Sequence, residues 1–341
     1  MFVLRISPLV LIVLVLCVSD YSTAFAQESE TAGLVVLKNG AMQISLSVPG
    51  DKVNYRGTRF DHSGMIQKIR WNDHQLCERW HDGPSNPDAN DDVTGPCEEF
   101  GNGAPLGYVS NSPGSNFVKI GVGVLKQPME TQYRFSNVYA FVKRGEWTTK
   151  HDESSIAYRQ RLFDDPVGKS IGYEYEKTIR VMENGFRIEH QLKNIGSNPW
   201  STDHYNHNFF LINSDKVGPN YELHLPFAIN AINRRASFDE TTKVVDKTVG
   251  FREMVGTRSF FAELSGHRNQ ISDHQFKLRH IPTGVTIECK GDSPLSKINF
   301  WGMANTICPE PYTQISLAAN GEFKWSLEYS ISIAEFVARS Q

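Results

Sequence analysis

Apolar and polar residues alternate with a period of two along most of the chain, in short runs separated by turn residues. The runs at 34–48 and 173–194 alternate on both sides of an Asn-Gly pair, Asn39-Gly40 and Asn184-Gly185, which predicts two β-hairpins. Helical periodicity is scarce. Further strands are predicted at 117–125, 155–163, 221–227, 284–290, 297–303, 313–319 and 323–333.

This pattern indicates an all-β protein. Ten or more strands without alternating helices favour a large antiparallel β-sandwich over any parallel fold. The chain shows no short internal repeat, which disfavours a propeller. We expect residues 27–341 to form a single β-sandwich domain, since either one large or two smaller domains would fit the length and no boundary is evident.

One long segment interrupts the strands. Residues 78–117 are rich in Gly, Pro, Asn and Asp and contain few aliphatic side chains. A loop of this length inside a compact domain is usually functional or disordered. Its acidic pair and its aromatic residues favour the first, so we expect this segment to form a wall of a site.

The N-terminus has the composition of a secretory signal. Arg5 precedes an apolar run that ends near Val18, and Ala24-Phe25-Ala26 provides a small-x-small cleavage site before Gln27. The run is shorter than the roughly 20 residues of a membrane span. A lipoprotein signal ending at Cys17 is disfavoured by the bulky Leu16. We expect residues 1–26 to be removed and the protein to be secreted or periplasmic, without a membrane anchor.

Charge and cysteine content narrow the chemistry. The net charge of −3 and the lack of a basic block argue against nucleic-acid binding. After cleavage four cysteines remain, Cys77, Cys97, Cys289 and Cys308, and none forms a C-x-x-C pair, so a zinc site of the usual spacing is not expected. Export permits a disulfide. A Cys77–Cys97 bridge and four buried free thiols are both open.

Residues 202–213, TDHYNHNFFLIN, contain two histidines spaced H-x-x-H. On a helix, His204 and His207 would lie side by side, but on a strand they point to opposite faces. Because the surrounding pattern is that of strands, we do not expect a shared metal ion. Each histidine is otherwise interpreted as a hydrogen-bonded member of a sheet.

This segment resembles the NHxYFNL strand of the galactose mutarotase (aldose 1-epimerase) family, with Asn206, His207 and Leu211 in matching positions. In that family the histidine is the general acid that protonates the sugar ring oxygen, and the resemblance gives this role to His207. A second match is NTICPEPYTQISLAANGEFKWSLEYSI near the C-terminus, which resembles the family's last strands. It implies that Glu310 is the general base, while Glu322 in the NGEF turn competes for that role.

The resemblance extends in order and strand character from about residue 30 to 335, with two departures. Mutarotases have a second histidine in an H-G-G loop, and the corresponding region here reads TGPCEEFGNGAPLGY. The Arg-Gly-Gly phosphate-binding loop of related sugar-phosphate epimerases is also missing. The resemblance therefore implies the fold and a sugar substrate, either a mono- or an oligosaccharide, but it leaves the particular sugar open.

Mutarotation needs an acid and a base whose pKa values lie near the working pH, and no metal or organic cofactor. The two prolines around Glu310 predict a fixed backbone and partial burial, which would raise its pKa. We expect a monomeric enzyme with His207 and Glu310 as the acid–base pair.

The remaining candidates would bind substrate. Arg56, Arg59 and Asp61 can grip hydroxyls or a sugar carboxylate, or they are solvated charges at a strand end. Glu98 and Glu99 can contact hydroxyls from the long segment, or they lie on a surface loop. Asp203, His204 and Asn206 can orient His207 or line a cleft. Trp71, Trp80, Phe100 and Trp301 can stack on a sugar, although such residues more often belong to the core.

Two other functions stay open. A glycoside hydrolase or polysaccharide lyase would use Glu310 with Glu98 or Glu99, and the separation of the carboxyl groups would identify a hydrolase. A carbohydrate-binding protein without turnover would keep the fold and the cleft, which the missing H-G-G histidine favours.

Overall fold

The computed structural model describes residues 33–50, 52–109, 112–129, 132–164 and 170–333. The predicted signal sequence at 1–26 lies outside these residues. Within them the strands form four antiparallel sheets, and the one α-helix, α1 (Ala236–Thr241), is short. The predicted all-β antiparallel sandwich is confirmed. No helix of the described part has the length and apolar character to cross a membrane.

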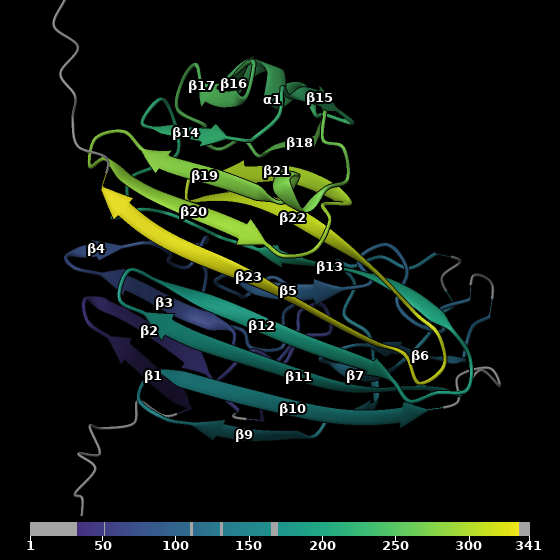
Figure 1. Cartoon of the computed structure of the whole chain (residues 1–341). Helices are drawn as coiled ribbons and strands as arrows, with labels where there is room; N and C mark the ends of the chain where they lie inside the picture. The colour runs from purple at the N-terminus through teal and green to yellow at the C-terminus, as the bar shows by residue number, and fades with distance from the viewer. Residues whose placement is uncertain (1–32, 51, 110–111, 130–131, 165–169, 334–341) are drawn as a thin grey trace, which may run out of the picture. The chain divides into compact units, whose positions relative to one another are not determined.

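The largest sheet has ten strands, and several of them follow one another across the front of Figure 1. In spatial order they are β16 (Thr242–Val245), β17 (Thr248–Phe251), β14 (Tyr221–His224), β19 (Gln275–His280), β20 (Val285–Gly291), β23 (Glu322–Ile333), β12 (Gly185–Asn194), β11 (Ile171–Met182), β10 (Ser155–Asp164) and β9 (Trp147–His151).

A six-stranded sheet packs behind it. Its order is β15 (Asn230–Ile232), β18 (Phe260–Ser265), β21 (Lys297–Met303), β22 (Thr306–Leu317), β13 (Trp200–His207) and β5 (Cys97–Phe100). The two smaller sheets are β1 (Leu34–Asn39), β2 (Met42–Ser47), β3 (Ile66–Trp71) and β4 (His74–Gln75), and β6 (Asn116–Lys119), β7 (Gly123–Lys126) and β8 (Phe141–Arg144).

Both predicted hairpins are present. β1 and β2 pair around a turn at Gly40-Ala41, and β11 and β12 pair around Glu183-Asn184. The predicted strand at 117–125 was wrong, because it folds into the β6–β7 hairpin. Gly121 in its turn has a φ of 80°, and a Cβ there would lie 2.5 Å from Oδ1 of Asp61. A glycine is therefore required where this turn approaches the core.

The long segment at 78–117 is less irregular than predicted. Its residues Cys97–Phe100 form β5, a fully buried edge strand that pairs with β13 in the register Tyr205↔Glu99 and His207↔Cys97. A short strand of this kind gives too few alternating positions to stand out in a sequence rich in turn residues.

The main core lies between the inward faces of the sheets. Alternate residues of the ten-stranded sheet, such as Leu223, Ile287 and Leu327, belong to one buried cluster with Phe260 and Phe300 of the six-stranded sheet. Because side chains alternate along each strand, the intervening residues of β18, β21 and β22 point away from this core. The six-stranded sheet therefore has a second face, and that face carries the site.

Candidate functional site

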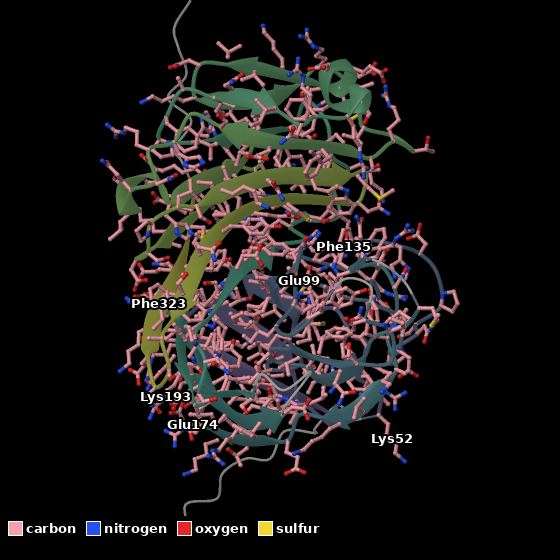
Figure 2. The ribbon with its side chains drawn as sticks, turned by 90° about the vertical axis from the view of Figure 1, so that its right-hand side faces the viewer. Lys52, Glu99, Phe135, Glu174, Lys193 and Phe323 are labelled. Carbon is pink, nitrogen blue, oxygen red and sulfur yellow. The ribbon has the colours of Figure 1, made fainter. Side chains whose placement is uncertain are left out.

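A cavity of about 560 Å³ lies on the second face of the six-stranded sheet. Strands β13, β18, β21 and β22 form its floor, and Arg59, Trp80, Asp91, Asn102 and Phe135 reach it from loops outside that sheet. Other hollows lie over the ten-stranded sheet, among residues such as Glu174 and Lys193, which are register partners on β11 and β12. Figure 2 shows these two residues on the opposite side of the view from Phe135.

The register of the strands arranges the floor in rows. One row runs through Tyr205, Tyr312 and Lys297, because Tyr205 pairs with Tyr312 and Tyr312 with Lys297.

The next row holds Glu310, Asn299 and Glu263. His207 lies two residues beyond Tyr205 on β13, which places it beside Glu310. A third row holds Cys308, Trp301 and Phe261.

The alternation predicted for residues 202–213 is confirmed. Tyr205, His207 and Phe209 line the cavity, whereas His204 packs on the opposite face against Phe100, with its Nδ1 accepting a hydrogen bond from Trp325 Nε1 at 3.2 Å. His204 and His207 therefore do not share a ligand site.

The backbone that carries His207 is held by close contacts. Phe209 has a φ of 45°, a conformation that costs a non-glycine residue about 1–3 kcal/mol and persists only where the surroundings enforce it. Its N–H donates to Cys308 Sγ at 3.2 Å, and the Cys97 thiol donates to the His207 carbonyl at 3.8 Å. A Cβ on Gly95 would lie 2.4 Å from that carbonyl, so no larger residue fits there.

This turn places the Phe209 ring flat on the His207 imidazole, with ring centroids 3.9 Å apart. Trp301 and Phe60 contact the imidazole edge-on at 5.2 and 5.9 Å. Burial in this aromatic cage disfavours the charged form and lowers the pKa of His207 well below its ordinary value, and the Arg59 charge lowers it further.

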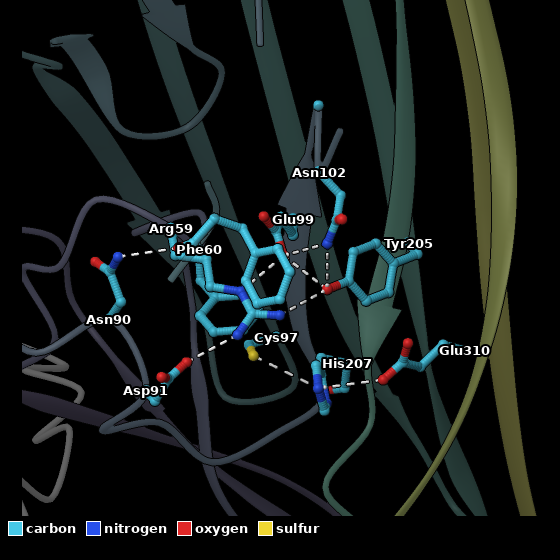
Figure 3. Close-up of polar contacts among 12 residues, drawn as sticks. Arg59, Phe60, Asn90, Asp91, Cys97, Glu99, Asn102, Tyr205, His207 and Glu310 are labelled. Carbon is cyan, nitrogen blue, oxygen red and sulfur yellow. Dashed lines mark hydrogen bonds and ion pairs between the residues drawn. The ribbon is translucent and has the colours of Figure 1, made fainter. Parts of the chain in front are cut away.

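His207 and Glu310 form a direct pair. Nε2 of His207 lies 3.1 Å from Oε1 of Glu310, and the two side chains are only 7% and 5% exposed (Figure 3). Burial raises the pKa of Glu310 to about 8, against the smaller opposing effect of Arg59. At neutral pH the imidazole is therefore neutral, and the one titratable proton that the two groups share resides on the carboxyl group of Glu310.

A second cluster holds the wall of the cavity in place. Arg59 Nε donates to Glu99 at 2.9 Å, its Nη1 to Asp91 at 2.8 Å and its Nη2 to the Tyr205 hydroxyl at 3.2 Å (Figure 3). Glu99 also accepts from Lys119 at 2.9 Å and from Tyr205 at 2.6 Å. Lys119 and Arg59 outweigh the effect of burial and lower the pKa of Glu99 to about 2.

The structure separates the acidic pair Glu98–Glu99. Because the two are neighbours on β5, Glu98 points to the inner face and does not line the cavity. There its carboxylate accepts from Lys177 at 2.6 Å, and Asp61 accepts from the same ammonium at 3.4 Å. Asp61 further accepts from Ser63 and Tyr175. Neither Glu98 nor Asp61 is brought to the cavity.

The other predicted binding residues also lie elsewhere. Arg56 is bound to Asp88 at 2.8 Å in a loop, and Asp203 accepts the backbone N–H of Asn102 at 3.1 Å beside the cavity. Asn206 shares the inward face with His204 and is fully buried. Of the proposed substrate-binding residues, Arg59 alone is among the side chains that line the cavity in the described structure.

The aromatic candidates divide in the same way. Trp80 and Trp301 line the cavity and contact each other edge-on at 6.0 Å. Trp71 and Phe100 belong to buried clusters on other faces. The prediction that the long segment forms a wall is confirmed, since Trp80, Asp91 and Asn102 come from it.

Sequence reasoning missed Asn102, Lys297, Asn299 and Glu263, which also line the cavity. Asn102 falls in the region that corresponds to the H-G-G loop, so that correspondence could have identified it. Lys297 and Asn299 alternate with the apolar residues of a predicted strand, which marked them as outward-facing but not as members of a site. Glu322, the competitor of Glu310, is exposed at the start of β23 and lies outside the cavity.

Within residues 33–333, as far as the structure describes them, His207, Cys308 and Glu310 form the group that could hold a metal ion. Their donor atoms all lie within 4.8 Å of one another. Burial raises the pKa of the Cys308 thiol well above its ordinary value, as it raises that of Glu310. Both groups would have to lose a proton to bind a cation, and the arrangement is suited first to proton transfer.

The four cysteines Cys77, Cys97, Cys289 and Cys308 are buried free thiols. The Cys77–Cys97 bridge is therefore not formed, and the alternative of free thiols is the one observed. Cys97 and Cys308 serve instead as packing and hydrogen-bonding groups beneath Phe209.

No protein-family model and no curated protein matches the chain. Solved structures do match. The GalM/aldose epimerase homologue from C. elegans is 11% identical with a TM-score of 0.55, and the match covers 89% of this chain and 99% of that one. The galactose mutarotase related enzyme from Lactobacillus acidophilus is 11% identical with a TM-score of 0.52, covering 89% and 98%. A galactose mutarotase-like protein from Clostridium acetobutylicum is 9% identical with a TM-score of 0.54, covering 88% and 95%.

At these identities the likeness concerns the fold, and it spans nearly the whole length of each of these structures. It agrees with the antiparallel sheets and with the resemblance found in the sequence. The chain therefore has the galactose mutarotase-like fold, as a divergent example of it.

Proposed function

We propose that this protein is an exported aldose 1-epimerase-like enzyme that interconverts the anomers of a sugar. The observation that carries the proposal is the buried His207–Glu310 pair, 3.1 Å apart on the floor of a cavity. The anomeric hydroxyl and the ring oxygen of a pyranose are bonded to the same carbon. An adjacent acid and base can therefore reach both oxygens at once.

The pair would act through its single proton. Glu310 donates this proton to the ring oxygen while His207 accepts the proton of the anomeric hydroxyl, so the bond between C1 and the ring oxygen breaks and the aldehyde forms. After rotation about C1–C2, the C5 hydroxyl that formed from the ring oxygen attacks the aldehyde and closes the ring again. In this closing step Glu310 is the base and His207 the acid. The mechanism therefore reverses the assignment that the sequence resemblance implies, in which His207 protonates the ring oxygen, because burial leaves the proton on Glu310 and not on His207. The enzyme returns to its starting protonation state.

The surrounding residues suit a sugar. Arg59, Asn102 and Asn299 line the cavity with polar groups that suit sugar hydroxyls, and Trp80 and Trp301 offer apolar faces. The proposal needs no metal ion or organic cofactor, because Glu310 supplies one proton and His207 accepts the other from the sugar. Export rests on the predicted signal sequence at 1–26, which lies outside the described residues.

The test is proton NMR of anomer interconversion with freshly dissolved α-glucose and α-galactose. The protein would be produced with its leader and purified from the exported fraction. We expect acceleration over the buffer blank, and a loss of about 10²–10⁴-fold in both Glu310→Gln and His207→Asn. Glu322→Gln is the matched control, because this exposed glutamate lies outside the cavity and should retain full activity.

Glycoside hydrolysis is the second candidate function, but with a different partner for Glu310 than the sequence predicted. Glu98 faces the inner core and Glu99 is held by Arg59 and Lys119, so neither is free to act with Glu310. Glu263 lies in the same row as Glu310, two strands away through Asn299, which places their Cα atoms about 9.5 Å apart. Cα atoms at this distance on one face of the sheet allow the carboxyl separation of about 6.5–9.5 Å that an inverting hydrolase needs.

Release of reducing sugar from an oligosaccharide, lost in Glu263→Gln, would favour the hydrolase. Anomer exchange that is unaffected by Glu263→Gln would favour the epimerase. Sugar binding without either reaction would identify a carbohydrate-binding protein that has kept the fold.

A further inference from the structure

Lys297 is a cation of the cavity that no established role explains. It lies on β21 beside Tyr312 of β22, and its ammonium stands 4.0 Å from the centroid of the Tyr312 ring. The side chain is half-buried and lines the cavity. Within the described part of the chain, no carboxylate lies within the 4.0 Å that defines an ion pair with this ammonium.

Several other charges around the cavity lie in ion pairs. Arg59 is paired with Asp91 and Glu99, and Glu99 is paired in addition with Lys119. On the far side Arg235 and Glu263 contribute one charge of each sign. Glu310 is largely protonated at neutral pH. Lys297 is therefore a positive charge without an ion-pair partner in a partly closed cavity, where water screens it less than at the surface. Asp203 is the other carboxylate beside this end of the cavity, and its charge acts on Tyr312.

The position of Lys297 restricts where a negative charge of the substrate would lie. Lys297 belongs to the row of Tyr205 and Tyr312, which is one step along the strands, about 6.7 Å, from the row of Glu310 and Asn299. The aromatic row of Trp301 and Phe261 lies on the other side of Glu310. The cavity thus has a polar, cationic end and an apolar end, with the acid–base pair between them.

A sugar bound with C1 and its ring oxygen at Glu310 and His207 has one substituent next to the ring oxygen, the group on C5. That group is the nearest part of the sugar that can extend into the neighbouring row. In a hexuronic acid it is a carboxylate with a single negative charge, which matches the single charge of the unpaired Lys297 ammonium. A phosphate ester carries up to two charges on a longer arm and matches less well.

We propose that the substrate of this site is a hexuronic acid, free or at the reducing end of an acidic oligosaccharide, whose carboxylate is bound by Lys297. This inference rests on the proposed function for the orientation of the sugar. Two other roles for Lys297 make different predictions. A lysine that only packs on Tyr312 would not distinguish charged from neutral sugars, and one that only tunes Glu310 would affect all sugars alike.

The test measures binding separately from turnover. Calorimetric or NMR titrations at pH 6.5 and low salt would compare glucuronate and galacturonate with glucose, galactose and glucose 6-phosphate. We expect each uronate to bind at least 10-fold more tightly than the corresponding neutral sugar. Lys297→Met should remove that preference and leave the affinity for glucose and galactose unchanged.

Lys290→Met is the matched control, because Lys290 is an exposed lysine paired with Glu288 at 3.1 Å on another sheet, and it should change nothing. Equal affinity for uronates and neutral sugars would overturn the inference, as would an equal loss for both in Lys297→Met. Tighter binding of glucose 6-phosphate than of glucuronate would overturn the assignment of the carboxylate.

Failure of this inference and failure of the proposed function are distinguishable. Uronate binding that depends on Lys297, without accelerated anomer exchange, supports the inference and contradicts the epimerase. Accelerated exchange of neutral sugars, without preferential uronate binding, supports the epimerase and contradicts the inference about Lys297.

Discussion

The chemistry of the site depends on how burial shifts the pKa values of two side chains. His207 is enclosed by three aromatic rings, and Glu310 lies beside it between two prolines of a central strand. Desolvation penalises the charged form of each, so it moves the two pKa values in opposite directions. The result is a neutral acid next to a neutral base, which is the protonation state that a reversible proton exchange requires.

A pH profile tests this state. As the pH rises through about 8, Glu310 loses the only proton of the pair, so the catalysed rate constant for anomer exchange should fall. The loss on the acid side should come only well below pH 6.5, where His207 is protonated. The measurement is the blank-corrected kcat for glucose between pH 5 and 9.5. A rate constant that keeps rising beyond pH 9 would contradict the one-proton pair.

Glu99 contributes stability that depends on pH. Its pKa of about 2 is depressed relative to the ordinary glutamate value of 4.5, because Lys119 and Arg59 stabilise the carboxylate. Its contribution, on the order of 3 kcal/mol, is fully present above pH 4.5 and should be lost as the pH falls towards 2. Urea titrations at several pH values between 5 and 2.5 would measure this. Glu99→Gln should show a shallower loss in that window, and an unchanged slope would contradict the assignment.

Strand β5 shows how an element converts neighbouring residues into separate functions. Glu98 and Glu99 are adjacent in sequence, yet one is bound to Lys177 inside the sandwich and the other to Arg59 and Lys119 behind the cavity. Strand β13 separates His204 from His207 in the same way. The alternation of β13 was evident in its sequence, whereas β5 was hidden among glycines, prolines and asparagines, so its acidic pair was interpreted as part of a loop.

Variants of the two glutamates should therefore differ in kind. Both Glu98→Gln and Glu99→Gln leave a buried ammonium or guanidinium with a weaker partner, so each should destabilise the fold by about 3–5 kcal/mol. Glu99→Gln should also raise KM for the sugar at least several-fold, since it releases Arg59, Tyr205 and Asn102. Glu98→Gln should leave KM unchanged.

Glu176→Gln is the control for these stability measurements. It interrupts a pair with Arg159 on the solvent side, and exposed pairs of this kind contribute less than about 1 kcal/mol. A shift in KM for Glu98→Gln as large as that for Glu99→Gln would argue against the separation of the two faces.

At the scale of the whole molecule, the sandwich needs no covalent crosslink. Its sheets enclose a large apolar core that includes Cys77 and Cys289, whereas Cys97 and Cys308 belong to a separate buried cluster. All four cysteines of the described chain are free thiols. Burial raises the pKa of each of these thiols, which suppresses the reactive thiolate.

The native protein should therefore be inert to a thiol reagent, and Cys77, Cys97, Cys289 and Cys308 should all react once it is unfolded. A reductant should leave the melting temperature unchanged, because there is no bridge to break. Counting modified thiols with and without denaturant checks the first point, and calorimetry checks the second. A melting temperature that falls by several degrees in reductant would reveal a disulfide.

Export is a further prediction for the whole chain. Expressed with its own leader in a bacterial host, the protein should leave the cytoplasm and begin at Gln27. Intact-mass measurement of the exported fraction checks the cleavage site, and Ala24→Asp with Ala26→Asp should block it, because a signal peptidase needs small residues there. An uncleaved N-terminus in the unmodified protein would contradict the signal assignment.

The sequence by itself determined the features that depend on local periodicity. Period-two alternation and Asn-Gly turns predicted the strands and hairpins, and the residues around His207 and Glu310 carried a resemblance to the family whose fold the structure has. Only the tertiary structure decided which other residues meet at the site. Glu263 and Lys297 come from separate strands, and strand register, which no local pattern specifies, brings them together. Arg59, Asp91 and Asn102 reach the site from loops outside that sheet. Burial, likewise a property of the assembled sheets, set the protonation of the central pair, and the fold left Lys297 in the cavity without an ion-pair partner.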